Sequence, residues 1–142
     1  MGFDLGVIAY VYPSNNTPTN ANTNEIYAAL TYGPVTAKYS RSLGNLFANA
    51  NSAISQYLEV AASFEVGNGF SVTPHLGRQT IPNQTASAGD YTDYALTVNN
   101  DLGNGLSASL TLLGTDAKEF YKVAPIDNLG KSGLLVGLKY SF

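Results

Sequence analysis

The chain has 142 residues and a formal net charge of −3, and only 12% of its residues are charged, about half the roughly 25% usual for soluble domains. It has no cysteine and one histidine, which excludes disulfides and thiolate chemistry and argues against a metal site. Seven Lys and Arg residues in the whole chain leave no footprint for nucleic acid, and no apolar run reaches the ~18 residues of a transmembrane helix. We predict one domain over residues 1–142, with no metal, no cofactor and no nucleic-acid partner.

Apolar and polar residues alternate along most of the chain, a pattern that is typical of half-exposed β-strands. Most of the predicted strands are close to the ~9–11 residues with which a tilted strand crosses a bilayer, whereas strands of globular proteins are most often about 5–6 residues long. In chain order the predicted strands, about eight in number, are Phe3–Tyr12, Glu25–Tyr32, Val35–Arg41, Gln56–Val66, Phe70–Arg78, Tyr91–Asp101, Leu106–Gly114 and Leu134–Phe142.

Short and long connections alternate between these strands. Tight turns are expected at Gly33-Pro34, Gly67–Gly69 and Leu102–Gly105, and the remaining connections are long segments rich in Asn, Ser, Thr and Gly, which is typical of mobile surface loops. This alternation predicts an up-and-down antiparallel meander with its tight turns at one end and its long loops at the other. The long segments are Pro13–Asn24, Ser42–Ser55, Gln79–Asp90 and Thr115–Ser132.

Alternation divides each strand into an apolar set and a polar set that face opposite sides of the sheet. A soluble, lipocalin-like barrel would place the apolar set inside and bind an apolar ligand there, whereas a membrane barrel would place that set outside, in lipid. In the membrane alternative the polar set lines the lumen. Its candidate lumen-lining residues are Asp4, Tyr10, Glu25, Tyr27, Lys38, Tyr57, Glu59, Glu65, His75, Tyr91, Asp93 and Lys139.

Three observations favour the membrane alternative. The polar set carries acids and bases of both signs, as a closed hydrogen-bonded interior requires, and the chain ends on an apolar-set aromatic, Phe142. Aromatic members of the apolar set also gather at the tight-turn end, which is typical of an interfacial girdle. We therefore predict an all-β fold, a closed up-and-down antiparallel transmembrane β-barrel of about eight strands. The predicted lipid-facing girdle is Phe3, Tyr32, Phe64, Phe70, Tyr140 and Phe142.

Several segments resemble the TorF-type porin family, outer-membrane proteins of Gram-negative bacteria. The resembling segments are Phe3–Tyr10, Asn24–Tyr27, Leu30–Ser40 with its Tyr-Gly-Pro turn, Gly77–Gln79, Asp90–Tyr94 and the closing Lys139–Phe142. The resemblance implies an outer-membrane location, a barrel architecture and recognition of the C-terminal strand by the barrel-insertion machinery. Unlike members of that family, this chain starts at Met1-Gly2 without a signal peptide or preceding strands.

Charges in the predicted interior are expected to form pairs. If the first and last strands close the barrel, Asp4 and Lys139 should form an ion pair near the tight-turn end. Glu59 and Glu65 lie six residues apart on one predicted strand, a spacing that could suggest a glycosidase-like acid pair. A sealing network with Lys38 and Lys139 is the simpler interpretation, so no catalytic residue and no enzymatic activity are predicted.

The interior of an eight-stranded barrel is only wide enough for side chains. We therefore expect His75 to be a hydrogen-bonded filler and the lumen to be narrow or filled, so that the barrel is structural or passes small solutes at most. Arg41 and Arg78 continue the apolar set at the long-loop end, where they could reach the phosphates of lipopolysaccharide. The expected partners are outer-membrane lipid and the insertion machinery, and the expected state is a monomer.

Overall fold

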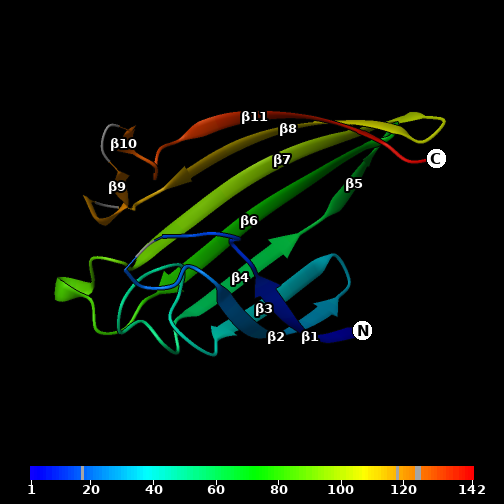
Figure 1. The fold of residues 1–142 in the computed structure, drawn as a ribbon. Helices are drawn as coiled ribbons and strands as arrows, with labels where there is room; N and C mark the ends of the chain where they lie inside the picture. The colour runs from blue at the N-terminus through cyan, green and yellow to red at the C-terminus, as the bar shows by residue number, and fades with distance from the viewer. Residues whose placement is uncertain (17, 118, 124–125) are drawn as a thin grey trace.

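The computed structural model describes residues 1–16, 18–117, 119–123 and 126–142. Within these ranges the chain is an all-β protein built on one antiparallel sheet of nine strands (Figure 1). A two-stranded hairpin, β9 (Lys122–Val123) and β10 (Ile126–Asn128), and two 3₁₀ turns, η1 (Thr85–Ser87) and η2 (Glu119–Tyr121), lie in the connections. The sheet strands are β1 (Gly2–Tyr10), β2 (Thr23–Tyr32), β3 (Val35–Ser42), β4 (Gln56–Ala62), β5 (Phe64–Gly67), β6 (Phe70–Thr80), β7 (Tyr91–Gly103), β8 (Leu106–Thr115) and β11 (Gly133–Tyr140).

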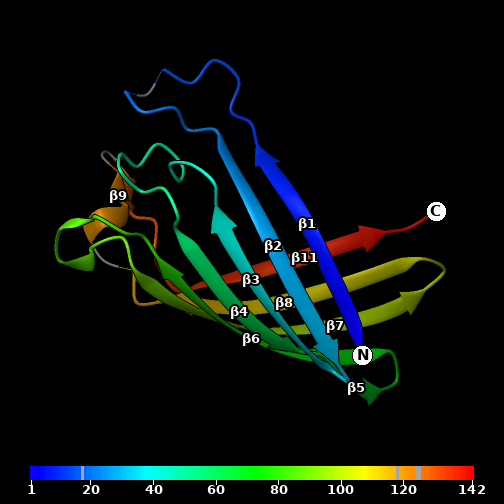
Figure 2. The same ribbon diagram turned by 90° about the horizontal axis from the view of Figure 1, so that it is seen from below.

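The strands follow one another across the sheet in the order β1-β2-β3-β4-β6-β7-β8-β11, and β5 pairs with β6 beside this path. The up-and-down antiparallel meander is therefore confirmed. Figure 2 shows the long connections gathered at one end, while the tight turns lie at the other. At the β7–β8 turn, Asn104 (φ 52°) and Gly105 (φ 79°) both take positive φ, as the tightest hairpin turns require.

Three predicted boundaries were wrong for local reasons. The predicted strand Gln56–Val66 is broken at Ser63, whose N–H bonds the Pro34 carbonyl (2.9 Å) while the chain leaves β3. The first strand stops at Tyr10, because the N–H of Tyr12 bonds the Asn22 side chain (2.8 Å) and not a neighbouring strand. The predicted loop Thr115–Ser132 contains η2 and the β9–β10 hairpin, which its sequence did not indicate.

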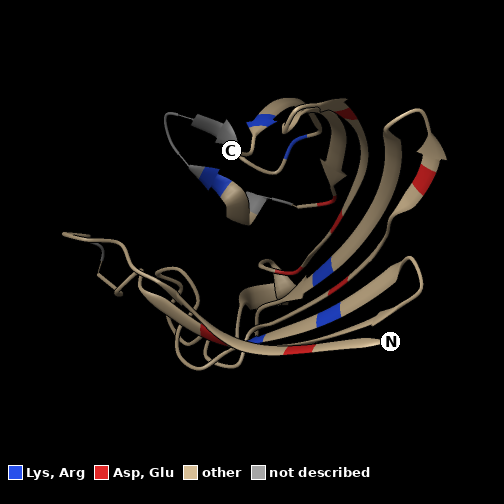
Figure 3. Cartoon of the chain, turned by 90° about the vertical axis from the view of Figure 1, so that its right-hand side faces the viewer, with Lys and Arg blue, Asp and Glu red and all other residues tan. Residues whose placement is uncertain are grey.

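The described sheet is open and does not close into the predicted barrel. β1 pairs only with β2, and β11 pairs only with β8, so these two strands are its edges. The predicted ion pair between Asp4 and Lys139 was therefore wrong for this structure, because it depended on pairing of the first and last strands. Figure 3 shows the sheet as a curved, open trough with η2 and β9 inside it.

The two sets of side chains predicted from the alternation lie on opposite faces of this trough. The polar set lies on the concave face, where Tyr91 of that set contacts Tyr121 of η2. The apolar set covers the convex face, and its large side chains, such as Leu5, Leu58 and Val136, are exposed. The molecule therefore presents its strand hydrophobes outward.

The buried hydrophobic residues lie in the long loops and not in the sheet. Among the described residues they are Leu46, 5% exposed, and Ile81, 4% exposed. The composition of these loops suggested mobile segments, yet the connection after β3 is tied together by buried hydroxyls: Ser52 Oγ accepts from the Leu46 N–H (2.8 Å) and donates to the Asn49 carbonyl (2.6 Å). Neither of the described 3₁₀ turns has the length and apolar character to cross a membrane.

Candidate functional site

Charged and aromatic side chains form a band across the concave face. The strand register places Asp4, Lys38, Glu59 and Asp93 in one row, because each occupies, directly or through Ala29 and Gly77, the position opposite the next. Adjacent rows add three more polar rings. We call this set the polar belt; it consists of Asp4, Tyr27, Lys38, Tyr57, Glu59, His75 and Asp93 and spans β1 to β7.

The half of the belt on β1 to β4 holds one ammonium group between a ring and a carboxylate. Lys38 Nζ lies 3.1 Å from Glu59 Oε1, so the ion pair expected for these residues is present. The same Nζ lies 5.1 Å from the centroid of the Tyr27 ring, which is within cation–π range. The Tyr27 hydroxyl donates to Asp4 Oδ2 (3.2 Å) and extends the chain of contacts to the β1 edge.

The other half of the belt centres on His75 of β6. Its Nε2 lies 3.1 Å from Asp93 Oδ1 and its Nδ1 lies 3.8 Å from Glu59 Oε2. The Tyr57 hydroxyl donates to Asp93 (Oδ2, 2.9 Å) and also lies 3.2 Å from His75 Nε2. His75 thus bridges two carboxylates on different strands, so its role as a hydrogen-bonded structural residue, expected from the sequence, agrees with this geometry.

Two tyrosines of the belt lie flat over glycines of the neighbouring strand. A methyl group built on Gly77 would overlap the Tyr57 hydroxyl, and one built on Gly6 would overlap the Tyr27 ring. Each ring therefore occupies the space that a Cβ would need, close to the sheet surface. This differs from the expectation that tyrosines fill the interior, because these rings lie along the wall and leave room beside it.

We expect Gly77→Ala to displace the Tyr57 ring and to destabilise the fold by about 1–3 kcal/mol, the usual cost of forcing an extra methyl into a packed site. Urea unfolding measures this change. The matched control is Gly2→Ala, where the nearest atom to the new methyl is Thr31 Cβ at an ordinary 3.7 Å. Equal effects of the two substitutions would show that the Tyr57–Gly77 contact has no energetic role.

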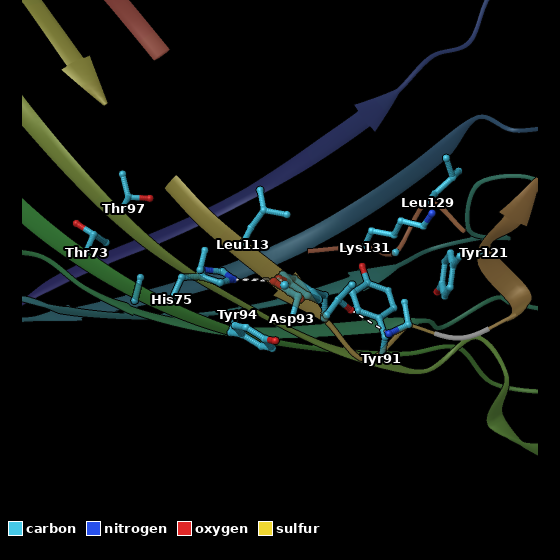
Figure 4. Close-up of a pocket in the computed structure, with 17 residues that line it drawn as sticks. Thr73, His75, Tyr91, Asp93, Tyr94, Thr97, Leu113, Tyr121, Leu129 and Lys131 are labelled. Carbon is cyan, nitrogen blue, oxygen red and sulfur yellow. Dashed lines mark hydrogen bonds and ion pairs between the residues drawn. The ribbon is translucent and has the colours of Figure 1, made fainter. Parts of the chain in front are cut away.

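A hollow of about 650 Å³ opens on the concave face beside the polar belt (Figure 4). Tyr57, His75 and Asp93 form one part of its lining, and Leu113 of β8 contributes an apolar side chain. Residues of the connection after β8 complete it, among them Tyr121. The hollow therefore combines a charged floor with aromatic and aliphatic walls, as small-molecule sites do.

Tyr121 fastens the connection after β8 to the mouth of the hollow. Its hydroxyl donates to the Gly89 carbonyl (2.5 Å), and its ring meets that of Tyr91 edge-to-face, with centroids 5.3 Å apart. Burial, reinforced by Tyr91 and Asp90, raises the pKa of the Tyr121 phenol. Because the phenol stays protonated at neutral pH, it remains a hydrogen-bond donor.

The remaining candidate lumen residues lie on the concave face outside the belt. Tyr10 stacks edge-to-face on Phe47 (5.0 Å) at the long-loop end, and Glu25 lies opposite Ser42 there. Glu65 is on β5 and Lys139 is on the β11 edge; no ion pair joins them in the described part of the chain, so that expected pair was wrong.

The convex candidates lie where the alternation placed them. All six girdle aromatics, Phe3, Tyr32, Phe64, Phe70, Tyr140 and Phe142, are exposed and lie at the tight-turn end. Arg41 and Arg78 lie at the long-loop end of the same face, where Arg78 donates to Thr92 Oγ1 (3.1 Å) and approaches Asp90 (3.7 Å). Their lipid contacts remain predictions.

Sequence reasoning missed the residues that complete the hollow from the loops. Tyr121, Leu129 and Lys131 come from a segment that carries no alternation, so no periodic signal could have located them. Gly77 was also missed, although its position two residues after His75 on the polar parity was visible. Within the residues that the structure describes, no group of three or more acidic, histidine or cysteine side chains could hold a metal ion.

Comparison with known proteins gives a family for the whole chain. The family model described as "Bacterial protein of unknown function (Gcw_chp)" matches residues 1–142, and the chain therefore belongs to this family. No curated protein and no solved structure gave a significant match.

Proposed function

We propose that this bacterial chain forms the wall of an outer-membrane β-barrel of porin type. Its convex apolar face lies in lipid, and its concave polar face lines a narrow lumen that is structural or passes small solutes. The observation that carries the proposal is the inverted distribution of apolar side chains, which cover the convex face while the buried hydrophobes are confined to the loops.

This distribution suits lipid and not water. Monomeric soluble proteins rarely expose a contiguous apolar patch larger than a few hundred Å², yet the exposed strand residues here run from Phe3 of β1 to Leu138 of β11 without a break between strands. In a transmembrane barrel this outward apolar band is the surface that contacts the acyl chains. The exposed aromatics at the tight-turn end suit the membrane interface.

The edges β1 and β11 support closure in the membrane. Unpaired backbone groups cost several kcal/mol each in hydrocarbon, so only closed barrels and helices span it. Along a meander of eight long strands the first and last run antiparallel, and their apolar sides both face the convex surface. Direct pairing of β1 with β11 would therefore leave the lipid face continuous.

The alternative of a soluble barrel that binds an apolar ligand is less well supported. Such a barrel needs an apolar interior, whereas the concave face here carries the polar belt with its ion pairs. The concave apolar residue Leu113 is one side chain beside a charged floor.

Association with lipid tests the proposal directly. We expect the refolded chain to float with lipid vesicles in a density gradient and to stay with them after an alkaline carbonate wash. A chain that remains monomeric and folded in buffer, without lipid or detergent, would contradict the membrane proposal and favour the soluble alternative.

Closure can be tested with engineered cysteines, because the described residues include none that could compete. We expect Asp4→Cys, combined in turn with Leu135→Cys, Gly137→Cys or Lys139→Cys, to form an intramolecular disulfide in one of the three pairs when the chain is in vesicles. These positions face the concave side of the two edge strands. Disulfides only between chains, or none, would show that β1 and β11 do not pair with each other.

A further inference from the structure

We infer that the hollow beside Asp93 is a binding site for small organic cations, compounds that carry an alkylammonium or quaternary ammonium group. This inference goes beyond the proposed function and does not depend on the placement of the sheet in a membrane. It rests on the charge of Asp93, the rings beside it and the size of the hollow.

Asp93 brings a negative charge to the lining. Its side chain is 27% exposed and its hydrogen-bonding partners are the Tyr57 hydroxyl and the His75 ring. In the described part of the chain no lysine or arginine forms an ion pair with it, in contrast to Glu59, which Lys38 neutralises. A carboxylate that accepts only from a hydroxyl and an imidazole retains lone pairs for a further cationic donor.

Aromatic rings stand next to this carboxylate. Tyr91 lies two residues before Asp93 on β7, so both side chains point to the concave face, and both line the hollow. The Tyr91 and Tyr121 rings are nearly perpendicular (89°), which leaves at least one face of each ring outside their mutual contact. An ammonium group near such a face is attracted by the ring quadrupole.

The same molecule already holds an ammonium group in this way. On the other half of the polar belt, Lys38 Nζ lies between the Tyr27 ring (5.1 Å) and the Glu59 carboxylate (3.1 Å). The hollow offers the same pair of groups, a tyrosine ring and a carboxylate, on one concave face. A soluble ammonium compound would there take the place that the lysine side chain takes in the first half.

The dimensions and the remaining lining set the size of the ligand. About 650 Å³ is within the range of small-molecule sites, roughly 300–1,000 Å³. Leu113 and Leu129 provide apolar surface for alkyl groups, whereas Lys131 also lines the hollow and disfavours a cation beside it. We therefore expect the ammonium group on the β7 wall at Asp93, with the alkyl part towards the two leucines (Figure 4).

Choline and its neutral isostere 3,3-dimethylbutan-1-ol test the inference, because they differ in charge and hardly in shape. The full chain, refolded in uncharged micelles with isotopically labelled tyrosines, is titrated with each compound, and the ring signals of Tyr91 and Tyr121 are followed by NMR. We expect choline to shift both signals saturably, and to bind at least about tenfold more tightly than the isostere, a difference within the range of desolvated cation–π and charge-assisted contacts.

Two variants place the site. Asp93→Asn keeps an acceptor for Tyr57 and removes the charge, and we expect it to weaken choline binding about tenfold; Tyr91→Leu should weaken it as well. Asp101→Asn removes a concave carboxylate that does not line the hollow and should leave the affinity unchanged. Equal binding of the isostere, unchanged affinity of folded Asp93→Asn, or absence of a saturable shift would each overturn the inference, and none of them would affect flotation with vesicles.

Discussion

Replacing Leu110 by arginine is expected to destabilise the protein in a lipid bilayer by about 2–4 kcal/mol, the cost of a basic side chain near the midplane of a barrel wall. Leu110 lies in the middle of β8, is 44% exposed, and is paired with Val98 on one side and Val136 on the other. All three side chains belong to the convex apolar face. The substitution therefore places a charge in the part of the sheet that the proposal assigns to acyl chains.

The control is Ser109→Arg, one residue earlier and on the concave face. That arginine can extend along the polar face, so it should act through crowding near Gly137, whose missing Cβ leaves room for the Ser109 hydroxyl. Urea unfolding in vesicles measures both variants. A Leu110→Arg variant as stable as the original chain in vesicles would contradict the assignment of the convex face to lipid.

Replacing Ile81 by alanine is expected to destabilise the long-loop end by about 2–4 kcal/mol, the range for removing a large buried aliphatic side chain. Ile81 is 4% exposed, its side chain packs against the backbone of Gly89, and its N–H donates to Asp90 Oδ1 (2.8 Å). The strands contribute no comparable hydrophobic core, so neighbouring side chains have little means of filling the cavity.

Ile54→Ala is the matched control for this change. Ile54 lies in the connection after β3, is 48% exposed, and has φ 68°, which a β-branched residue adopts at a cost. Removing its branch should change stability by no more than about 0.5 kcal/mol. The urea midpoint and the rate of proteolysis in the loops measure both variants; equal losses would show that the buried loop residues do not hold the loop end together.

The strands and their two faces could be predicted because alternation is a local property. Each residue of β2 or β8 reaches its face through the period of the strand alone, so positions such as Leu30 and Thr111 needed no knowledge of their neighbours. The Lys38–Glu59 pair could also be anticipated, since both residues belong to the polar set of strands expected to be close. Tight turns were marked by glycine and asparagine, which tolerate positive φ.

The remaining features depend on contacts between distant segments. Whether β1 meets β11 is decided by the curvature of the whole sheet, which no single strand encodes. The break at Ser63 follows from a hydrogen bond to Pro34, a residue far away in sequence. The hollow needed Tyr121, and that side chain is placed by the Gly89 carbonyl, so neither residue gave a recognisable signal before the fold was known.

The polar belt and the hollow give the concave face a more specific character than a passive filling of side chains. In the belt, His75 links carboxylates on two other strands, and the Tyr57 ring lies over Gly77, so the wall is held together across β4, β6 and β7. Because these rings lie close to the sheet, space remains beside Asp93. A small solute, and not an additional side chain, is the occupant that we expect there.

The most direct test of the central claim is a cysteine scan along β8, from Ser107 to Leu112, in a chain that otherwise has no cysteine. Each cysteine carries an environment-sensitive fluorophore, and the refolded chain in vesicles is exposed to lipids brominated in their acyl chains and to a water-soluble quencher. The account predicts a strict alternation: labels at Ala108, Leu110 and Leu112 are quenched by the brominated lipids, and labels at Ser107, Ser109 and Thr111 are not. Quenching of all six positions from water, or the opposite alternation, would contradict it.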